Sequence, residues 1–493
     1  MCGIFGIIVK PGASYKPATI GKVLKNLALL SESRGKDSSG IAFRNAASGS
    51  INVLKGDIPV SDLLKHSVYA ENLAGALKAF SSGSGFSAFG HARLVTNGSQ
   101  LNEVNNQPVI KDDILVIHNG IIVNVDEIWN KFPNLNRAFN IDTEIIPALV
   151  RSKLSTGANL IKACNDSFRE LTGTFSVAMM LADSAEFVFA TNNGSLYYVT
   201  DRKSFFAFAS ESFFMDELLK SKIFDEFDQT GGVIQLVSNT GVAVNMNSLN
   251  ISLFSLIETR DLPELSACEK LLVINKHTIE NQDARNEVVI DPAIFINRNN
   301  EQHLFNLLEY NIEAVRQLKR CTKCLLPETF PFIEYDEKGV CSYCNHFKPQ
   351  NMAGSVEQLM TLVEPFRSKD GKPDCIVPFS GGRDSTYSLH IVKKNLGLHP
   401  IAFTYDWGMV TDLARRNIAR VCGKLGVENI IVSADIRWKR ENIRKNISAW
   451  LKDPKLGMIP LFMAGDKYFF YYTNEVKKRT GIKLNIWGIN NLE

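Results

Sequence analysis

The spacing of apolar and polar residues divides the chain into parts of different architecture. Up to about residue 245, short and often alternating apolar runs such as GIFGIIV, ILVIHNGIIVN and FSVAMMLA are separated by Gly and Asn. Alternation with a period of two is typical of half-buried strands. Helical spacing interrupts these runs at about 18–31, 142–152 and 158–171. The pattern therefore predicts an α+β domain with stacked sheets over residues 2–245.

A weaker pattern follows, with polar runs over residues 246–300 that suit a connector. The next segment has apolar residues at helical spacing: Leu304, Leu307, Leu308, Ile312 and Val315. We expect them to form one face of a helix that packs in a core or between domains. The sequence thus predicts a connector with a helix over residues 246–315.

From residue 374 the pattern becomes strand, turn, helix, strand, helix. The segments are CIVPF, SGGRDS, TYSLHIVKKNLG, PIAFTYD, a helix through 411–425 and NIIVSAD. Strands that alternate with helices are typical of βαβ units, which build a parallel sheet. We expect a doubly wound α/β domain over residues 351–493. The fold class predicted for the whole chain is therefore multidomain, α+β followed by α/β.

The composition excludes several classes of protein. With 493 residues, 45% of them hydrophobic and 22% charged, the chain suits about three globular domains and is unlike disordered, collagen-like or coiled-coil sequences. Its 55 Lys and Arg against 52 Asp and Glu leave a net charge of +3, which favours neither nucleic acid nor a membrane surface as a partner. No apolar run reaches the roughly 18 residues that span a bilayer, and the first residues do not form a signal peptide. We expect a cytoplasmic protein.

The nine cysteines indicate chemistry rather than cross-linking. One is at position 2 and four lie between 321 and 344, a pattern that favours a nucleophile and a metal site over a disulfide framework. Removal of the initiator Met would make Cys2 the first residue. Its α-amine, with a pKa of roughly 7.7–8, could then take the thiol proton without a separate histidine. Taken alone, Cys2 would sooner be interpreted as an incidental small residue.

Later segments of the same domain give Cys2 a context. In order they are CGIFG at 2–6, RGKDSSG at 34–40, GHARLVTNG at 90–98, NQP at 106–108, HNG at 118–120 and DTE at 142–144. This ordered set resembles the class II (N-terminal nucleophile) glutamine amidotransferases over about 240 residues. The resemblance implies an Ntn-type αββα sandwich that hydrolyses the side-chain amide of glutamine. One departure is Lys36, where relatives usually carry Pro or Tyr.

The resemblance also implies roles for single residues. The Asn119 side chain and the Gly120 N–H would stabilise the oxyanion that forms when Cys2 attacks the amide carbon. Arg93, a planar fork, would pair with the α-carboxylate of glutamine, and Asp142 would pair with its α-ammonium. The alternative for Arg93 and Asp142 is a surface ion pair or a helix cap.

Other motif residues are expected to support this pocket. Thr96 would also bind glutamine, and Arg34 and Asp37 would shape the pocket. We expect His91 and His118 to be structural residues of the motif strands, with no catalytic role.

Four cysteines form two CxxC pairs that are separated by 16 residues: Cys321, Cys324, Cys341 and Cys344. Two such pairs supply four thiolates for a tetrahedral Zn²⁺, and four thiolates leave no position open for water. The spacing therefore predicts a structural zinc ribbon over residues 316–350, with four free core cysteines as the alternative. His346 lies nearby, and we expect it not to be a ligand.

A glycine-rich loop follows the strand CIVPF and opens a helix. It consists of Ser380, Gly381, Gly382, Arg383, Asp384 and Ser385. Glycines let the backbone approach phosphates, the helix N-terminus favours anions, and the Ser hydroxyls donate further hydrogen bonds. The loop lacks the Lys of GxxxxGK[ST] and resembles the PP-loop of ATP pyrophosphatases; a simple Gly-Ser turn is the alternative.

The PP-loop resemblance implies ATP and Mg²⁺ as cofactors. Asp384 would help to hold Mg²⁺ and the departing pyrophosphate, while Tyr405 and Asp406, at the end of the next strand, would lie at the adenosine.

The stretch from Cys321 through SGGRDS to the C-terminus resembles the N-acetyl sugar amidotransferases of surface-polysaccharide synthesis, which are PP-loop enzymes with an N-terminal four-Cys segment. The resemblance implies an ATP-dependent C–N ligase that adenylates an acetamido group and lets ammonia displace AMP to leave an amidine. Its partners would be glutamine and an N-acetylated sugar of the nucleotide or nonulosonate type, with a homo-oligomer permitted and no nucleic acid or membrane span.

Three other functions are compatible with parts of the sequence. Asparagine synthetase joins the same two catalytic halves and adenylates aspartate, but its family lacks the four-Cys insert and its loop usually reads SGGLDS. A non-catalytic scaffold predicts no glutaminase activity, and a thiol-modifying tRNA enzyme fits poorly with an ammonia-producing domain. Only 108 residues follow Ser385, whereas the relatives that the resemblance names continue with further strands and helices, so we also expect the PP-loop domain to be truncated.

Overall fold

The structure is a computed structural model, and it divides into two compact units. The first unit holds Met1–Asn281, Val363–Ala434 and Tyr471–Glu493, and the second holds Gln282–Leu362 and Asp435–Phe470. The residues that the structure describes are 2–95, 99–227, 231–259, 262–263, 265, 270–280, 309, 311–348, 354–408, 410–433, 436–452 and 466–489.

Two sheets form the N-terminal part of the first unit. The larger has eight strands, antiparallel except for the parallel pair at one edge. Its strands, in spatial order, are β11 (Ile234–Gln235), β9 (Tyr197–Thr200), β10 (Phe205–Ala209), β1 (Gly3–Val9), β4 (Phe86–Arg93), β2 (Ser38–Asn45), β3 (Ser50–Gly56) and β14 (Val273–Ile279). The smaller sheet is antiparallel, in the order β13 (Ile251–Ser255), β12 (Thr240–Asn245), β8 (Glu186–Thr191), β7 (Gly173–Leu181), β6 (Ile114–Ile122) and β5 (Val109–Lys111).

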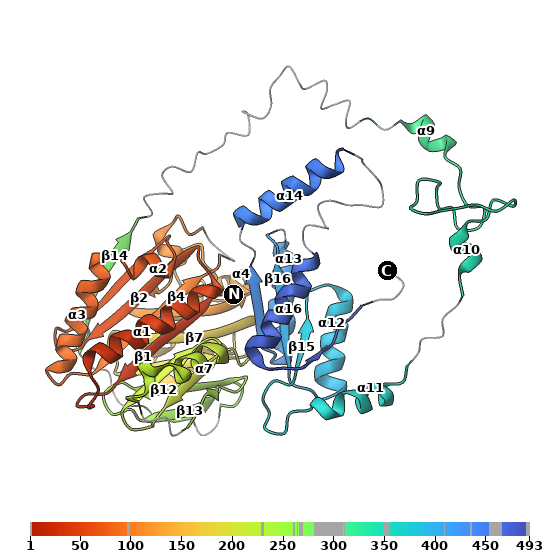
Figure 1. Ribbon diagram of the computed structural model, residues 1–493. Coiled ribbons are helices and arrows are strands. Elements are labelled where there is room, and N and C mark those ends of the chain that lie inside the picture. Colours follow the sequence, from red (N-terminus) through yellow and green to blue (C-terminus); the bar gives the residue numbers. More distant parts are fainter. Residues whose placement is uncertain are drawn as a thin grey trace, which may run out of the picture. The chain divides into compact units, whose positions relative to one another are not determined.

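The two sheets stack face to face, with helices on both outer faces (Figure 1). Ile4 and Ile8 of β1 point into the core between the sheets, whereas Phe5, Ile7 and Val9 point into the core under the helices. Successive side chains of β1 therefore alternate between two cores, and the strand is buried on both faces. The predicted αββα sandwich is confirmed.

Seven helices cover these faces among the described residues. Those over the larger sheet are α1 (Pro17–Ser31), α2 (Val60–Leu63), α3 (Ser67–Ser81) and α7 (Ser212–Lys220). Those over the smaller sheet are α4 (Val125–Lys131), α5 (Ile145–Ser155) and α6 (Leu160–Phe168). Short 3-10 turns, η1 (Glu32–Arg34), η2 (Glu103–Asn105), η3 (Asp142–Glu144) and η4 (Lys222–Phe224), join elements of this layer structure. The three helices expected from the periodicity correspond to α1, to η3 with α5, and to α6.

Strands beyond residue 245 belong to the same sheets. β13 pairs antiparallel with β12, and β14 pairs parallel with β3. The sheets therefore continue into the segment that the polar pattern assigns to a connector. These are edge strands with mostly exposed or half-buried side chains, so they need few apolar residues.

A separate parallel sheet completes the first unit. Its spatial order is β17 (Asn429–Ser433), β16 (Pro400–Asp406), β15 (Cys375–Pro378) and β18 (Leu484–Asn485), with every pairing parallel. The helices of the βαβ pattern are α12 (Arg383–His390), which continues as a π-helical turn over Ile391–Asn395, and α13 (Asp412–Leu425). Thr411 caps the start of α13, and Gly426 ends it with a φ of 62°. The predicted parallel sheet is confirmed.

The remaining elements lie in the second unit or in the segments of the first unit that border it along the chain. They are α9 (Ile312–Gln317), α10 (Ser342–His346), α11 (Val356–Val363), the 3-10 turn η8 (Glu364–Phe366), α14 (Ile436–Trp450) and α16 (Asp466–Thr480). Ile312 and Val315 of the predicted apolar stripe are exposed, and Leu304, Leu307 and Leu308 lie outside the described residues. Within the described part of the chain, no helix is long and apolar enough to cross a membrane.

Candidate active site and metal centre

The candidate nucleophile, Cys2, directly precedes β1 in the middle of the larger sheet. A Cβ on the next residue, Gly3, would lie 2.5 Å from the carbonyl oxygen of Ser31, so glycine is needed where the chain passes the end of α1. The Cys2 thiol is buried and donates a hydrogen bond to the Leu94 carbonyl, with a sulfur–oxygen distance of 3.5 Å. Burial raises the pKa of this thiol, and the nearby positive charge of Arg93 opposes the rise.

Arg93 and Asp142 lie with Cys2 in one electrostatic cluster. The Arg93 side chain is 2% exposed, and its Nη1 donates to Asn106 Oδ1 at 3.0 Å. Burial lowers the pKa of Arg93, and the neighbouring Cys2 and Asp142 counteract that effect. Asp142 Oδ2 accepts a hydrogen bond from the Ile122 N–H at 2.9 Å. The structure therefore brings together the nucleophile, the cation and the anion that the sequence predicts for glutamine binding, whereas Thr96 lies outside the described residues.

The candidate oxyanion residues lie on β6. Asn119 Nδ2 donates to Ser195 Oγ at 3.4 Å, which leaves the second N–H of this amide for another acceptor. Asn119 Oδ1 is buried without a hydrogen-bond partner. At Gly120, a Cβ would lie 2.0 Å from the Thr174 carbonyl oxygen, so no side chain fits there.

The loop that follows η1 packs against the backbone at Arg93. A Cβ on Gly35 would lie 2.1 Å from the Arg93 carbonyl carbon, and Asp37 Oδ2 accepts from the Val95 N–H at 2.7 Å. Arg34 forms a buried ion pair with Glu211, while its Nε and Nη2 have no hydrogen-bond partner. These contacts join the loop at Arg34 and Asp37 to the end of β4, and the expected role of the two residues in shaping a glutamine pocket stays a prediction.

Both motif histidines are fully enclosed. His91 Nε2 lies 3.3 Å from the His118 carbonyl oxygen, and His118 Nδ1 lies 3.2 Å from Thr143 Oγ1. Burial lowers the pKa of both rings, so they are neutral near pH 7. Their contacts join β4, β6 and η3, which agrees with the structural role expected for them.

Sequence reasoning missed a set of residues that hold this site. Ser195 Oγ donates to the Ser210 carbonyl oxygen at 3.2 Å, and Ser210 Oγ accepts from the Ile4 N–H at 3.3 Å. The set thus links Asn119 to the strand that begins after Cys2. No spacing rule singles out a serine or a glutamate such as Glu211 at the end of a strand, because their partners come from distant parts of the chain.

The glycine-rich loop has the predicted position between β15 and α12. Ser380 Oγ lies 3.2 Å from Ser385 Oγ, and Ser385 Oγ donates to the Gly382 carbonyl at 3.2 Å. Gly381 has a φ of 78°. Arg383 and Asp384 open α12 and are exposed.

Tyr405 and Asp406 end the neighbouring strand β16, and Phe379 N–H donates to the Phe403 carbonyl at 2.7 Å. Asp406 Oδ2 accepts from Arg415 Nη2 at 2.8 Å, and the Tyr405 ring stacks on Tyr472 with 5.2 Å between centroids. Because parallel strands end at the same edge of a sheet, the loop and these two residues lie on one edge.

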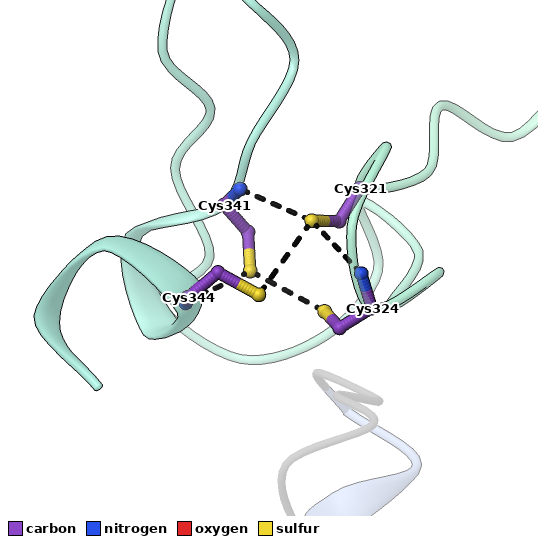
Figure 2. Close-up of side chains that lie close together, drawn as sticks. All are labelled: Cys321, Cys324, Cys341 and Cys344. Carbon is purple, nitrogen blue, oxygen red and sulfur yellow. Dashed lines mark hydrogen bonds between the residues drawn. The ribbon is translucent and has the colours of Figure 1, made fainter. Parts of the chain in front are cut away.

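The four predicted metal ligands meet at one point of the second unit, as Figure 2 shows. All four sulfur atoms of Cys321, Cys324, Cys341 and Cys344 lie within 4.8 Å of one another. The Cys321–Cys344 and Cys324–Cys341 sulfur distances are 3.9 and 3.5 Å. A tetrahedron with Zn–S bonds of about 2.3 Å has edges of about 3.8 Å. The group therefore fits a zinc ion in donor type and in spacing.

Backbone amides surround the Cys321 sulfur. The N–H groups of Lys323, Cys324 and Cys341 donate to it over 3.3, 3.4 and 3.2 Å. Burial raises the pKa of this thiol, but these hydrogen bonds outweigh burial and lower the pKa to about 6. Such bonds favour the thiolate, which is the form that binds metal. His346 Nδ1 instead contacts the Ser342 carbonyl at 2.7 Å.

Comparisons with known proteins find a match to one family in part of the chain. Residues 91–217 match the model of the family described as "Glutamine amidotransferase domain". The chain is 30% identical over 203 residues to glutamine–fructose-6-phosphate aminotransferase (isomerizing) of Mesorhizobium japonicum, covering 39% of this chain and 29% of that relative. The enzyme of the same name from Pyrococcus horikoshii is 29% identical over 231 residues, 44% of this chain and 35% of the relative.

The matched part of the chain spans about a third of the length of these curated relatives. Among solved structures, the glutamine phosphoribosylpyrophosphate amidotransferase of B. subtilis matches with a TM-score of 0.37 and 20% identity, covering 53% of this chain and 50% of that chain. The family match shows a glutamine amidotransferase domain over residues 91–217, and the sequence relatives are similar to this chain over part of their length.

Proposed function

We propose that the N-terminal domain hydrolyses glutamine to glutamate and ammonia with Cys2 as the nucleophile. The observation that carries the proposal is the cluster of Cys2, Arg93 and Asp142 within a domain that matches the glutamine amidotransferase family. Arg93 and Asp142 offer opposite charges for the α-carboxylate and α-ammonium of one amino acid. The curated relatives carry names of enzymes that use glutamine.

The reaction divides into two steps. The α-amine of a processed Cys2 takes the thiol proton, and the sulfur attacks the side-chain amide carbon of glutamine. Asn119 Nδ2 and the Gly120 N–H stabilise the oxyanion, the proton passes to the leaving nitrogen, and ammonia departs to leave a γ-glutamyl thioester. Water then attacks the thioester, releases glutamate and restores the thiol.

We further propose that the parallel sheet uses the ammonia in an ATP-dependent step. In the strand order β17-β16-β15-β18, the strands after β15 are added on one side of it and β18 is added on the other side. In open α/β sheets, ligands bind outside the carboxyl ends of the strands at the point where the order of addition changes side. The loop Ser380–Ser385 lies at this point. When bound, ATP with Mg²⁺ would supply the adenylate that activates a neutral acetamido oxygen as a leaving group.

The residues of this edge would hold the nucleotide. Ser380, Ser385 and the loop backbone would donate to phosphate, Asp384 would help to hold Mg²⁺, and Tyr405 and Asp406 would bind at the adenosine. The proposed acceptor is an N-acetylated sugar, whose acetamido group becomes an acetamidino group. The four-cysteine cluster supports this acceptor over aspartate, because the asparagine synthetases to which the two halves are also similar lack such an insert. Four thiolates would hold Zn²⁺ as a structural ion.

Glutamate release from glutamine tests the first proposal. Cys2→Ala should reduce the rate to background. Cys164→Ala, which removes a buried thiol of α6 outside the cluster, should keep the wild-type rate.

With ATP and N-acetylated sugars, mass spectrometry should detect an amidine product, and ammonium should restore that product in Cys2→Ala. Full glutamine use by Cys2→Ala would overturn the nucleophile. Glutamine-dependent turnover of aspartate in place of the sugars would overturn the acceptor.

A further inference from the structure

Glu428, the residue before β17, inserts a carboxyl group from the parallel sheet into the amidotransferase domain. Its side chain is 5% exposed, and its carbonyl oxygen accepts from the Ala402 N–H of β16 at 2.8 Å. The Tyr197 hydroxyl of β9 donates a short hydrogen bond to Glu428 Oε2. The same hydroxyl accepts from Gln235 Nε2 at 3.0 Å. Glu428 is thus fixed on one side by its own sheet and on the other by the larger sheet of the amidotransferase domain.

The titratable groups that face Glu428 are Tyr197 on β9, Glu211 before α7 and Arg34 on η1. Arg34 and Glu211 already form a buried ion pair, so Glu428 is a second carboxyl beside a single cation. Burial raises the pKa of Glu428 to about 8, Glu211 adds to the rise, and Tyr197 and Arg34 oppose it. The group therefore changes charge in the physiological pH range.

Both members of the ion pair adjoin residues that hold the candidate active site. Gly35, which follows Arg34, lies against the Arg93 backbone, and the positive charge of Arg34 lowers the pKa of Cys2. Glu211 follows Ser210, which holds the Ile4 N–H and, through Ser195, the Asn119 amide. β17 itself lies next to η1.

We propose that Glu428 is a positioning residue for glutamine hydrolysis, acting on the Cys2 site through Tyr197 and the Arg34–Glu211 pair. The inference rests on the proposed glutaminase function. With Glu428 neutral, Arg34 is balanced by Glu211 alone and retains charge that stabilises the Cys2 thiolate. With Glu428 ionised, a second carboxylate competes for Arg34, and the thiolate is less favoured. The parallel sheet thereby adjusts the reactivity of a site in another domain.

The test is the pH profile of kcat/KM for glutamate release by the full chain and by Glu428→Gln. The titrations of Cys2 and of the α-amine occur in both proteins, so the ratio of the two profiles isolates Glu428. We expect the ratio of wild type to Glu428→Gln to fall about threefold across a step near pH 8, which corresponds to about half a pKa unit at Cys2. The hydrogen bond from Tyr197 favours the ionised form of Glu428, so its removal in Tyr197→Phe should raise the pKa of Glu428 and move the step to higher pH.

The matched control is Glu186→Gln, which changes another buried carboxylate. Glu186 lies at the start of β8, where it accepts a hydrogen bond from Asn245 Nδ2 at 2.7 Å. The end of β8 that lies near the candidate site is the opposite one, where Thr191 pairs with Ser176. Its ratio to wild type should show no step. A flat ratio for a folded Glu428→Gln would overturn the inference while leaving the glutaminase intact. If Glu428→Gln does not fold, a flat ratio of wild type to Tyr197→Phe around pH 8 would overturn it in the same way. Absence of glutamate release by the wild-type chain would instead overturn the proposed function and the inference together.

Discussion

Gly423 of α13 approaches the backbone of Gly173 in β7 so closely that a Cβ on Gly423 would lie 1.8 Å from the Gly173 carbonyl oxygen. Ala419, one turn earlier on the helix, packs on Ile121 and Val123, which follow the candidate oxyanion residues of β6. The other side of α13 meets the glycine-rich loop, because a Cβ on Gly381 would lie 2.8 Å from the Ala414 carbonyl oxygen and 3.0 Å from Ile418 Cγ1. One helix therefore contacts both proposed active sites.

Gly423→Ala should destabilise this contact. Backbone on both sides of the clash cannot rotate away, so the helix must shift, and overpacking of this kind costs about 1–3 kcal/mol. We expect calorimetry to show a melting temperature lower by several degrees and glutamate release to show a reduced kcat. Gly75→Ala is the matched control: it is an exposed helical glycine of α3 with nothing within 4 Å of its Cβ position, so it should keep or slightly raise stability. Equal effects of the two substitutions would contradict the packing argument.

The four-cysteine segment has almost no apolar core of its own. Over residues 311–348, only Cys321 and Cys341 are buried. A segment of this size needs a metal or another staple to keep one structure. We therefore expect about one zinc ion per chain in the purified protein.

Cys341→Ser should lose the metal, and limited proteolysis should then cut within 311–348. Cys422→Ala removes a buried cysteine of α13 that is not part of the cluster, and it should keep the zinc. Elemental analysis by mass spectrometry measures both variants. Wild-type protein without zinc after purification free of chelators, or unchanged zinc in Cys341→Ser, would contradict the assignment.

The sequence predicted the elements and residues whose signals are local. The CxxC pairs, the strand-loop-helix around Gly381 and the order of motifs from Cys2 to Asp142 each depend on short spacings, and the structure brings those side chains together where it describes them. Edge strands were harder to predict from the sequence. β14 is polar along most of its length, and it is recognisable only by its pairing with β3, which lies more than 200 residues earlier in the chain.

Glu428 could not be found from the sequence for a related reason. It lies in VENIIVS as an ordinary polar residue before an apolar run, and nothing local distinguishes it from an exposed turn residue. Its burial depends on the parallel sheet packing against the amidotransferase domain, and its charge depends on Arg34, Tyr197 and Glu211. Contacts between domains leave no periodic pattern in either segment.

The buried carboxyl of Glu428 also predicts how stability depends on pH. Burial raises its pKa from an ordinary value of 4.5 to about 8, so the folded chain binds this proton more tightly than the unfolded chain does. The contribution to stability is fully present below about pH 4.5 and is lost as the pH rises to about 8, by at most about 1.4 kcal/mol per pH unit. Glu428→Gln cannot ionise, and it should therefore gain stability relative to wild type between pH 5 and pH 8. Melting temperatures of both proteins measured across this range test the expectation, and a constant difference between them would show that Glu428 is not buried as a neutral acid.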